Sequence, residues 1–418
     1  MTPSARIQAV IEILQGLNHT DQPVDRYLRD WARAHRFAGS KDRASIGERI
    51  FAIERHRASF AWRMQSENPR MLAIASLLNE NFDEAALENI FSGEKYAPPK
   101  LSEDERALVI VPPKETPPLY VQGEFPEFLQ GELAGRFGEN LLPEMAALAE
   151  RAPVDLRVNT LKATREDVLQ QLREQGYGAN PARYSPLGIR IPPGEGSAAL
   201  SKSEAFENGL FEFQDESAQI ASLLCDAKPG MRVLDLAAGA GGKSLALAAA
   251  MNNEGEVEAR DIRAAALEQL AKRASRAGGS IIRTTETAGP FDLVLVDAPC
   301  SGSGTWRRQP ELKWRLTQAR LAQFTRTQDE LLARAAVLVR PGGRLVYATC
   351  SVLPCENERR IAAFLGTHPR FSVLPAAGLW RDITSQPAPP GMGEFFAASP
   401  YLTGTDGFFT AVLALQDG

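Results

Sequence analysis

Short apolar runs that alternate with helical stretches after residue 213 constrain the fold of this chain more than any other feature. The runs are MRVLDLAAG, EVEARDI, FDLVLVDAP and GGRLVYATC, and a stretch with helical periodicity separates each run from the next. Strands that are buried on both faces and joined through helices form a largely parallel, doubly wound sheet. We therefore predict an α/β domain over residues 213–418, with its chemistry at the carboxyl ends of the strands.

The preceding 212 residues divide into two further parts. Apolar residues recur at helical spacing between about residues 4 and 92. Seven prolines lie within residues 93–127, which we expect to form a connecting loop with one short apolar turn. Farther along, VDLRVNTL alternates like a strand and EDVLQQLREQG has a helical pattern that ends at a glycine. We predict an all-helical domain over residues 1–145 and a small α+β module over residues 146–212.

Composition limits the class of protein. The chain has 418 residues and a formal net charge of -5, which argues against a protein that coats nucleic acid non-specifically. Its four cysteines are too sparse for a disulfide scaffold and fit a reducing compartment. The first residues do not have the pattern of a secretory signal, and no apolar run reaches the roughly 20 residues that span a bilayer. We expect a cytoplasmic, monomeric protein without a metal ion or a membrane contact.

A glycine-rich turn follows the first strand of the predicted sheet. It consists of Ala237, Ala238, Gly239, Ala240, Gly241, Gly242 and Lys243. Glycines let the backbone approach a ligand and leave amide groups available to bind it. Asp261 closes the next strand, where a carboxylate can accept hydrogen bonds from both hydroxyls of a ribose. The turn therefore indicates a nucleotide-like cofactor, and a tight turn without a ligand is the alternative.

Two details indicate which nucleotide the turn binds. The turn lacks the pattern G-x-G-x-x-G, which is typical of dinucleotide-binding enzymes. Asp235 precedes it, and a carboxylate there would repel a pyrophosphate but suit a cationic methyl donor. S-adenosylmethionine is therefore the leading candidate, and a nucleotide-dependent oxidoreductase is a rival interpretation.

Two cysteines also follow predicted strands. Cys300 lies in Asp297-Ala298-Pro299-Cys300-Ser301-Gly302, and Cys350 lies in Thr349-Cys350-Ser351. Two thiols at the carboxyl ends of two parallel strands can face one pocket. Free cysteines are also commonly small buried apolar side chains, so position alone leaves both interpretations open.

Taken together, these motifs resemble the RsmB/Fmu (Sun) family of RNA cytosine-C5 methyltransferases, within the NOP2/Sun superfamily. The resemblance rests on the Cys300 motif, on the run YATCSVLP followed by Glu356 and Asn357, and on the Gly-Gly-Lys that ends the turn. Further matches are RVNTLK at 157–162, QDESAQ at 214–219, RRQPELKW at 307–314 and TDGFF at 405–409. The likeness spans about residues 150–415. It implies a Rossmann-like S-adenosylmethionine-dependent domain with an RRM-like α+β module.

The N-terminal part resembles, in the segment RFAGSKDRASIGERIF, the NusB-like RNA-binding domain that many bacterial members carry. A helical dimerisation or scaffold domain is the alternative. The family's usual substrate in bacteria is small-subunit ribosomal RNA, so the resemblance implies 16S rRNA. Transfer RNA and DNA are the alternative substrates. An assembly protein that binds RNA but has lost catalysis is the alternative function.

By the same resemblance, Cys350 is the nucleophile and Cys300 assists release of the product. A thiolate that adds to C6 of cytosine makes C5 able to accept a methyl group, and Lys243 is a candidate cation to favour that thiolate. Asp297 would contact the edge of the cytosine and the cofactor. The 237–243 turn would hold the methionine end of the cofactor and Asp261 its ribose. In a DNA cytosine methyltransferase, Cys300 would be the nucleophile instead.

Departures from the family pattern leave the adenine contact unassigned. Family members commonly have a proline where this chain has Ala240, and an aspartate near the adenine where residues 281–287 contain none. Glu286 is the available substitute. RNA contacts are expected from Arg157, Asn159, Lys162, Arg307, Arg308 and Lys313, with Trp314 as a stacking surface.

Overall fold

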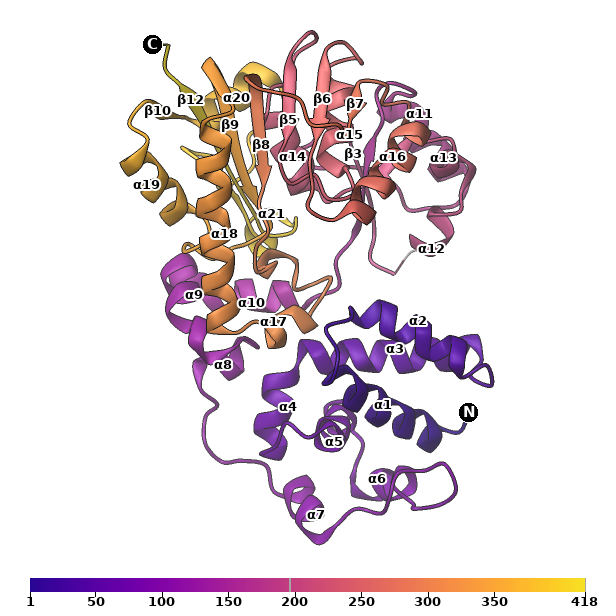
Figure 1. Ribbon diagram of the computed structural model, residues 1–418. Helices are drawn as coiled ribbons and strands as arrows, with labels where there is room; N and C mark the ends of the chain where they lie inside the picture. Colours follow the sequence, from indigo (N-terminus) through magenta and orange to yellow (C-terminus); the bar gives the residue numbers. More distant parts are fainter. Residues whose placement is uncertain (195–196, 418) are drawn as a thin grey trace. The chain divides into compact units, whose positions relative to one another are not determined.

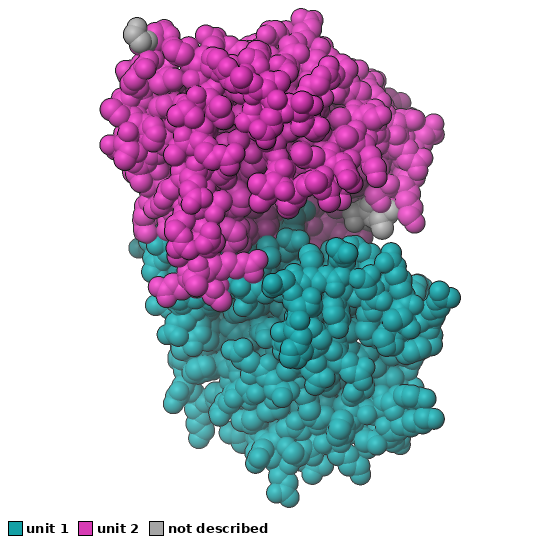
Figure 2. Space-filling model, viewed as in Figure 1, with its two compact units in different colours: residues 1–149, 306–316 teal, residues 150–305, 317–418 magenta. Residues whose placement is uncertain are grey.

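The computed structural model describes residues 1–194 and 197–417 and contains two compact units (Figures 1 and 2). Unit 1 consists of Met1–Ala149 together with Trp306–Leu316, and unit 2 consists of Glu150–Thr305 and Thr317–Gly418. The predicted α/β range of 213–418 did not anticipate that residues 306–316 leave that domain. None of the described helices is both long and apolar enough to cross a membrane.

Unit 1 is helical, as predicted. Its helices are α1 (Pro3–Leu17), α2 (Val24–Ala34), α3 (Ser40–Arg55), α4 (Arg57–Met64), α5 (Pro69–Asn79), α6 (Glu84–Ile90), α7 (Glu103–Ile110), α8 (Leu119–Gln122), α9 (Gln130–Phe137), α10 (Leu141–Ala149) and α17 (Glu311–Arg315). Buried residues on α1, α3 and α5 form its core, among them Val10, Ile50 and Ile74. Their helical spacing in the sequence is what places them on one face.

The proline-rich stretch contains more structure than the predicted loop with one turn. Helix α7 forms there because Ser102 and Glu105 make a capping box: the Ser102 hydroxyl accepts from the Glu105 amide at 3.1 Å, and the Glu105 carboxylate accepts from the Ser102 amide at 2.9 Å. Acidic residues fill its first turn and complement the helix dipole. A local cap thus starts a helix between prolines that would end one.

Helix α17 and the residues before it pack into unit 1 through polar contacts. Lys313 donates from Nζ to the carbonyl of Arg55 at 3.1 Å, and the indole of Trp314 donates to the carbonyl of Glu54 at 2.7 Å. Lys313 and Arg307 are buried, and Arg308 is partly buried. Burial lowers the pKa of Lys313 to about 8. Burial of both side chains does not support the phosphate contacts expected of Arg307 and Lys313, which remain a prediction.

The predicted α+β module is present in unit 2. Its sheet has the order β2-β3-β1-β4, and β1 pairs antiparallel with both β3 and β4. The elements are β1 (Val154–Val158), α11 (Arg165–Glu174), β2 (Asn180–Pro181), β3 (Gly188–Ile191), α12 (Ser197–Leu200), α13 (Glu204–Glu207) and β4 (Phe211–Phe213). Leu156, Ile189 and Phe211 pack against Val168 and Leu172 of α11, which gives the module its own core.

The larger sheet of unit 2 has the doubly wound arrangement that the sequence predicts. Its order is β10-β12-β9-β8-β5-β6-β7, with β11 paired to β12, and the pairs from β9 through β7 are parallel. The strands are β5 (Arg232–Asp235), β6 (Glu256–Ala259), β7 (Ile282–Arg283), β8 (Phe291–Asp297), β9 (Val339–Thr349), β10 (Phe371–Leu374), β11 (Phe396–Ala398) and β12 (Phe408–Leu415). The antiparallel strands β10, β11 and β12 extend the parallel core at one edge (Figure 1).

Helices cover both faces of this sheet. On one face α14 (Glu216–Leu224), α15 (Gly242–Ala250) and α20 (Ala376–Ile383) pack on residues such as Leu293, Leu295 and Val346. On the other, α18 (Gln318–Ala336) and α19 (Glu358–Thr367) pack on Val294 and Val296. The remaining helices are α16 (Ala264–Ala277) and α21 (Pro400–Thr403). Successive residues of β8 thus face opposite cores, and for this reason the strand is an unbroken apolar run.

Three residues expected to bind RNA connect the module to the large-sheet domain. Arg157 donates to the carbonyl of Gly242 at 2.7 Å, and Lys162 donates to the carbonyl of Arg276 at 2.6 Å. Asn159 donates from Nδ2 to the carbonyls of Gly209 at 2.9 Å and Ala277 at 2.7 Å. Arg157 and Asn159 are buried. Their placement does not support the predicted phosphate contacts, because their donors already bind carbonyl groups of the protein.

Replacing Asn159 with Ala should destabilise unit 2. The change leaves two buried carbonyls without their donor, which costs about 2–4 kcal/mol of the free energy of unfolding. Urea unfolding followed by circular dichroism measures this difference. The exposed Asn180→Ala in the same module is the matched control and should change stability by less than about 0.5 kcal/mol. Equal stability of the two variants would contradict this role for Asn159.

Candidate active site

Two thiols meet at the carboxyl ends of β8 and β9. The strands pair in parallel with Asp297 opposite Ala348, so the residues that follow each strand emerge side by side. The Sγ atoms of Cys300 and Cys350 lie 3.4 Å apart, within the distance of a hydrogen bond between a thiol and a thiolate. Both side chains are partly accessible, and neither cysteine is in a disulfide. The two thiols therefore lie together at one edge of the sheet, which is the arrangement that the sequence left open.

The protonation of Cys300 differs from that of an ordinary thiol. Its hydrogen bond with Cys350, followed by burial and by the charges of Cys350 and Glu356, raises the pKa of Cys300 well above its usual value. Cys300 therefore retains its proton at neutral pH and can donate a hydrogen bond to the sulfur of Cys350.

A buried glutamate holds the two cysteine loops together. Glu356 is inaccessible to solvent. Its carboxylate accepts two hydrogen bonds from Ser301, the residue that follows Cys300: one from the amide at 2.8 Å and one from the hydroxyl at 2.5 Å. The same carboxylate accepts from the Ser351 hydroxyl at 2.5 Å, beside Cys350, and from Gln328 of α18 at 3.1 Å. Gln328 also donates to the carbonyl of Pro299 at 3.0 Å. Glu356 is thus a shared acceptor that fixes the spacing of both loops.

A lysine and an aspartate form an ion pair near the thiols. Lys243, in the first turn of α15, lies 2.6 Å through Nζ from Oδ2 of Asp297 at the end of β8. Burial opposes the charge of Lys243, but Asp297, Asp235 and Cys350 together raise its pKa. Lys243 also lies over the ring of Phe408, 5.0 Å from its centroid. The structure brings together the predicted residues Lys243, Asp297, Cys300 and Cys350.

The glycine-rich turn has the backbone conformation of a ligand cradle. Gly239 and Gly241 have φ of +55° and +84°, and a side chain on Gly241 would place Cβ 2.5 Å from Leu270. Helix α15 begins at Gly242, so its first amides and positive dipole end face the mouth of the turn. Asp235, under the turn, is fully buried and accepts from the Ser244 hydroxyl at 2.6 Å. Burial raises the pKa of Asp235 to about 7.

Asp261 stands where the sequence predicts a ribose contact, but its oxygens have protein partners. It accepts from the Gly239 amide at 2.9 Å, and Arg263 donates to it from its amide at 2.8 Å and from its guanidinium at 3.0 Å. The Arg263 hydrogen bond lowers the pKa of Asp261. The side chain of Arg263 is 68% exposed, so a ligand hydroxyl can replace it at the carboxylate.

Sequence reasoning missed an exposed apolar residue next to this carboxylate. Ile262 is 98% exposed, unusually high for a branched apolar side chain, and it directly follows Asp261. An apolar side chain beside a carboxylate that is predicted to bind ribose is suited to a flat heterocycle. The signal was present, because an isoleucine between Asp261 and Arg263 interrupts a polar segment. Glu286, the expected substitute near the adenine, is instead 75% exposed and 4.0 Å from Arg260.

Known proteins resemble this chain in sequence and in fold. The family described as 16S rRNA methyltransferase RsmB/F matches residues 222–414, and a ferredoxin-like domain of RsmF/B-like methyltransferases matches residues 125–194. Probable ribosomal RNA small subunit methyltransferases B from Synechocystis sp. and Bacillus subtilis are 33% and 32% identical to the chain. Each alignment covers 70% of this chain, and 67% and 66% of the relative, respectively. The crystal structure of PH0851 matches with a TM-score of 0.76 and 27% identity over 99% of each chain.

Replacing Glu356 with Gln should change the chemistry of Cys300 without removing a side chain. Loss of the negative charge lowers the pKa of Cys300, so the pH midpoint of its alkylation by iodoacetamide should move to lower pH. Mass spectrometry of the Cys300 peptide measures that midpoint, over a pH range that extends above about 10 because the pKa of Cys300 lies well above its usual value. The exposed Glu330→Gln on α18 is the control.

Two other outcomes would argue against this role of Glu356. If the variant is alkylated faster by the same factor at every pH, Glu356 only restricts access to the site. If neither midpoint nor rate changes, its charge does not act on Cys300 at all.

Proposed function

We propose, from the premise that this chain belongs to the RsmB/F family of 16S rRNA methyltransferases, that it methylates C5 of a cytosine in small-subunit ribosomal RNA. The observation that carries this proposal is the pair of thiols 3.4 Å apart at the ends of β8 and β9. C5 of cytosine is too weak a nucleophile to be methylated directly, and covalent catalysis by a thiolate removes that obstacle.

Cys350 is the attacking residue in this proposal. The raised pKa of Cys300 supports that assignment, because a thiol that keeps its proton is a poor nucleophile and a good hydrogen-bond donor to its neighbour. The Cys350 thiolate adds to C6 of the cytosine, and the ring electrons that this addition displaces make C5 nucleophilic. A DNA methyltransferase that attacks through Cys300 is disfavoured by the same argument.

The second cysteine of the pair completes the catalytic cycle. Once C5 carries the methyl group, a base must take the C5 proton so that its electrons re-form the C5–C6 double bond and expel the Cys350 thiolate. Bonding of the Cys350 sulfur to C6 removes the charge and the hydrogen-bond acceptor that hold the proton on Cys300, so Cys300 can then give that proton to solvent and act as the sulfur base. A thiol with a raised pKa is a correspondingly strong base when it is ionised, which suits this step.

Asp297 and Lys243 orient the cytosine. The Asp297 side chain is 35% exposed beside the thiols, so its carboxylate can accept a hydrogen bond from the exocyclic amino group. Lys243, paired with Asp297 at 2.6 Å, keeps a positive charge beside the ring and stabilises the negative charge that thiolate addition places on it. Lys243 therefore acts on the pyrimidine through Asp297 as well as on the Cys350 thiolate.

The residues of the glycine-rich turn and of the end of β6 fit S-adenosylmethionine. The left-handed backbone at Gly239 and Gly241 supports close approach of a ligand, Asp235 is a carboxylate below the turn, and Asp261 is an acceptor for ribose hydroxyls. Ile262 would contact the adenine. When bound, this cofactor supplies the methyl group. In this proposal Ala237–Lys243 hold its methionine end, and Arg263 leaves Asp261 as the ribose binds.

Replacing Cys350 with Ser should abolish methylation, while Cys300→Ser should slow product release and leave RNA bound covalently to Cys350. A serine hydroxyl is a far weaker nucleophile than a thiolate, so the loss in turnover should exceed 1000-fold, or about 4 kcal/mol. Bisulfite sequencing of small-subunit ribosomal RNA incubated with each variant measures the product. The covalent complex appears as a slow band on a denaturing gel.

The half-buried Cys355→Ser, on the same loop, is the control and should retain activity. Turnover by Cys350→Ser within tenfold of the parent would refute the covalent mechanism. An unmethylated small subunit with a methylated transfer RNA would refute the proposed substrate instead. Calorimetric titration with S-adenosylmethionine separates both results from a failure to bind the cofactor.

A further inference from the structure

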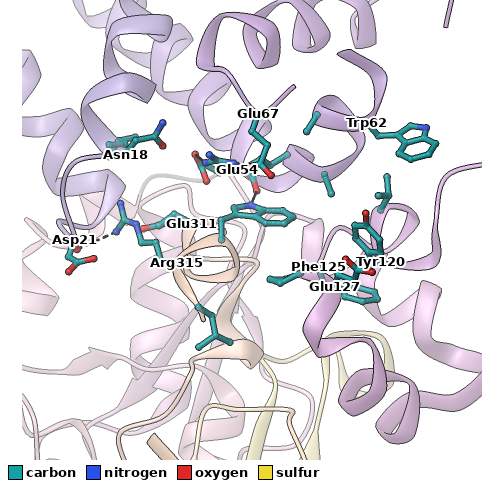
Figure 3. A pocket seen from close by; sticks show the side chains of 18 of the residues that line it. Asn18, Asp21, Glu54, Trp62, Glu67, Tyr120, Phe125, Glu127, Glu311 and Arg315 are labelled. Atoms are coloured by element: carbon teal, nitrogen blue, oxygen red, sulfur yellow. Dashed lines mark hydrogen bonds and ion pairs between the residues drawn. The ribbon is translucent and has the colours of Figure 1, made fainter. Parts of the chain in front are cut away.

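Unit 1 contains a pocket of about 820 Å³ that the proposed chemistry does not use. Helices α3, α4 and α8, the segment after α1, and α17 contribute its walls. Figure 3 shows Tyr120, Phe125 and Glu127 gathered on one side of the pocket and Asp21, Glu311 and Arg315 on the other. All of its lining residues belong to unit 1, including those of α17.

The lining of the pocket is acidic. Two guanidinium groups line it, those of Arg57 and Arg315, whereas five carboxylates do: Asp21, Glu54, Glu67, Glu127 and Glu311. Part of that positive charge is already committed, because Arg57 lies 3.5 Å from Glu54 and Arg315 donates to the carbonyl of Asp21 at 3.3 Å. Such a lining repels phosphate groups and attracts cations.

One of these carboxylates is buried and incompletely paired. Glu311 is 4% exposed. Its Oε1 accepts from the amide of Val24 at 3.2 Å, whereas Oε2 is buried and has no hydrogen-bond partner among the described residues. A buried carboxylate oxygen without a donor costs free energy, and a ligand that brings N–H groups would remove that cost. Glu54, close by, has its pKa raised by burial and, in part, by the charge of Glu311.

Aromatic rings complete the pocket. Trp62, Tyr120 and Trp314 line it, and the hydrogen bond from the Trp314 indole to the carbonyl of Glu54 fixes that ring in place. Lys313 lies 5.2 Å from the Trp314 ring centroid and is buried in unit 1. Flat rings beside carboxylates match a guanidinium, which stacks on an aromatic face while its edge donates to a carboxylate.

We propose that this pocket binds an arginine side chain on a basic segment of a partner protein. The guanidinium donates to Oε2 of Glu311 and stacks on an aromatic wall, and the surrounding carboxylates attract the rest of the basic segment. This site is separate from the thiols, so it adds a protein-docking function to the proposed RNA chemistry. An RNA ligand is disfavoured because its phosphates would face the five carboxylates.

Calorimetric titration of the full-length chain tests this directly. The probe is a short glycine-arginine peptide, and the matched probe carries citrulline, which keeps the shape of arginine without its charge. We expect saturable binding of the arginine peptide and at least tenfold weaker binding of the citrulline peptide. Raising the salt concentration from 50 to 300 mM should weaken binding of the arginine peptide.

Variants locate the site. Glu311→Gln retains the acceptor for the Val24 amide but loses the negative charge. It should weaken binding of the arginine peptide at least tenfold. Glu67→Gln changes an exposed carboxylate of the same pocket and should also weaken binding, which guards against a folding defect in the first variant. Glu103→Gln, exposed on α7 and outside the pocket, is the control.

Three outcomes would overturn the proposal. The first is equal binding of the arginine and citrulline peptides. The second is a Glu311→Gln variant that is as stable as the parent and binds the arginine peptide as tightly. The third is displacement of the peptide by a short RNA whose own binding depends on Glu311, which would identify the pocket as a nucleotide site.

Discussion

The parallel pairing of β8 with β9 is the interaction on which the candidate site depends. It places Asp297 opposite Ala348, and the two loops that follow carry Cys300 and Cys350 to a separation of 3.4 Å. The buried carboxylate of Glu356 then accepts hydrogen bonds from Ser301 and Ser351 and prevents the loops from separating. The sheet topology thus brings two thiols together, and the charge of the buried carboxylate is one of the causes that raise the pKa of Cys300.

Strand ends predict where this site lies, whereas the roles of Cys300 and Cys350 were expected from the resemblance to the RsmB/Fmu (Sun) family. Cys300, Cys350, Asp297 and the glycine-rich turn each follow an apolar run, and a doubly wound sheet brings such ends to one edge. The acceptor role of Glu356 could not be predicted, since it depends on side-chain contacts between loops 55 residues apart. The same limit applies to residues 306–316, whose contacts with unit 1 leave no periodicity in the sequence.

The hardest property to predict was whether a basic side chain faces solvent. Arg157, Lys162 and Lys313 were expected on an RNA-binding surface, yet each donates to a carbonyl group of the protein. A basic residue in a matching motif indicates where a charge lies along the chain, but not whether solvent reaches it. The acidic pocket of unit 1 shows the converse, because its carboxylates are scattered through the sequence and only the tertiary packing of unit 1 gathers them.

The covalent role of Cys350 is tested most directly by mapping the adduct formed with RNA that contains 5-fluorocytidine, in which fluorine at C5 blocks release of the thiolate. Trypsin separates the two sulfurs, because Cys300 falls in residues 284–307 and Cys350 in residues 345–359. We expect mass spectrometry to find the nucleotide on Cys350 in the 345–359 peptide. An adduct on Cys300 in the 284–307 peptide, with Cys350 unmodified, would contradict this role of Cys350.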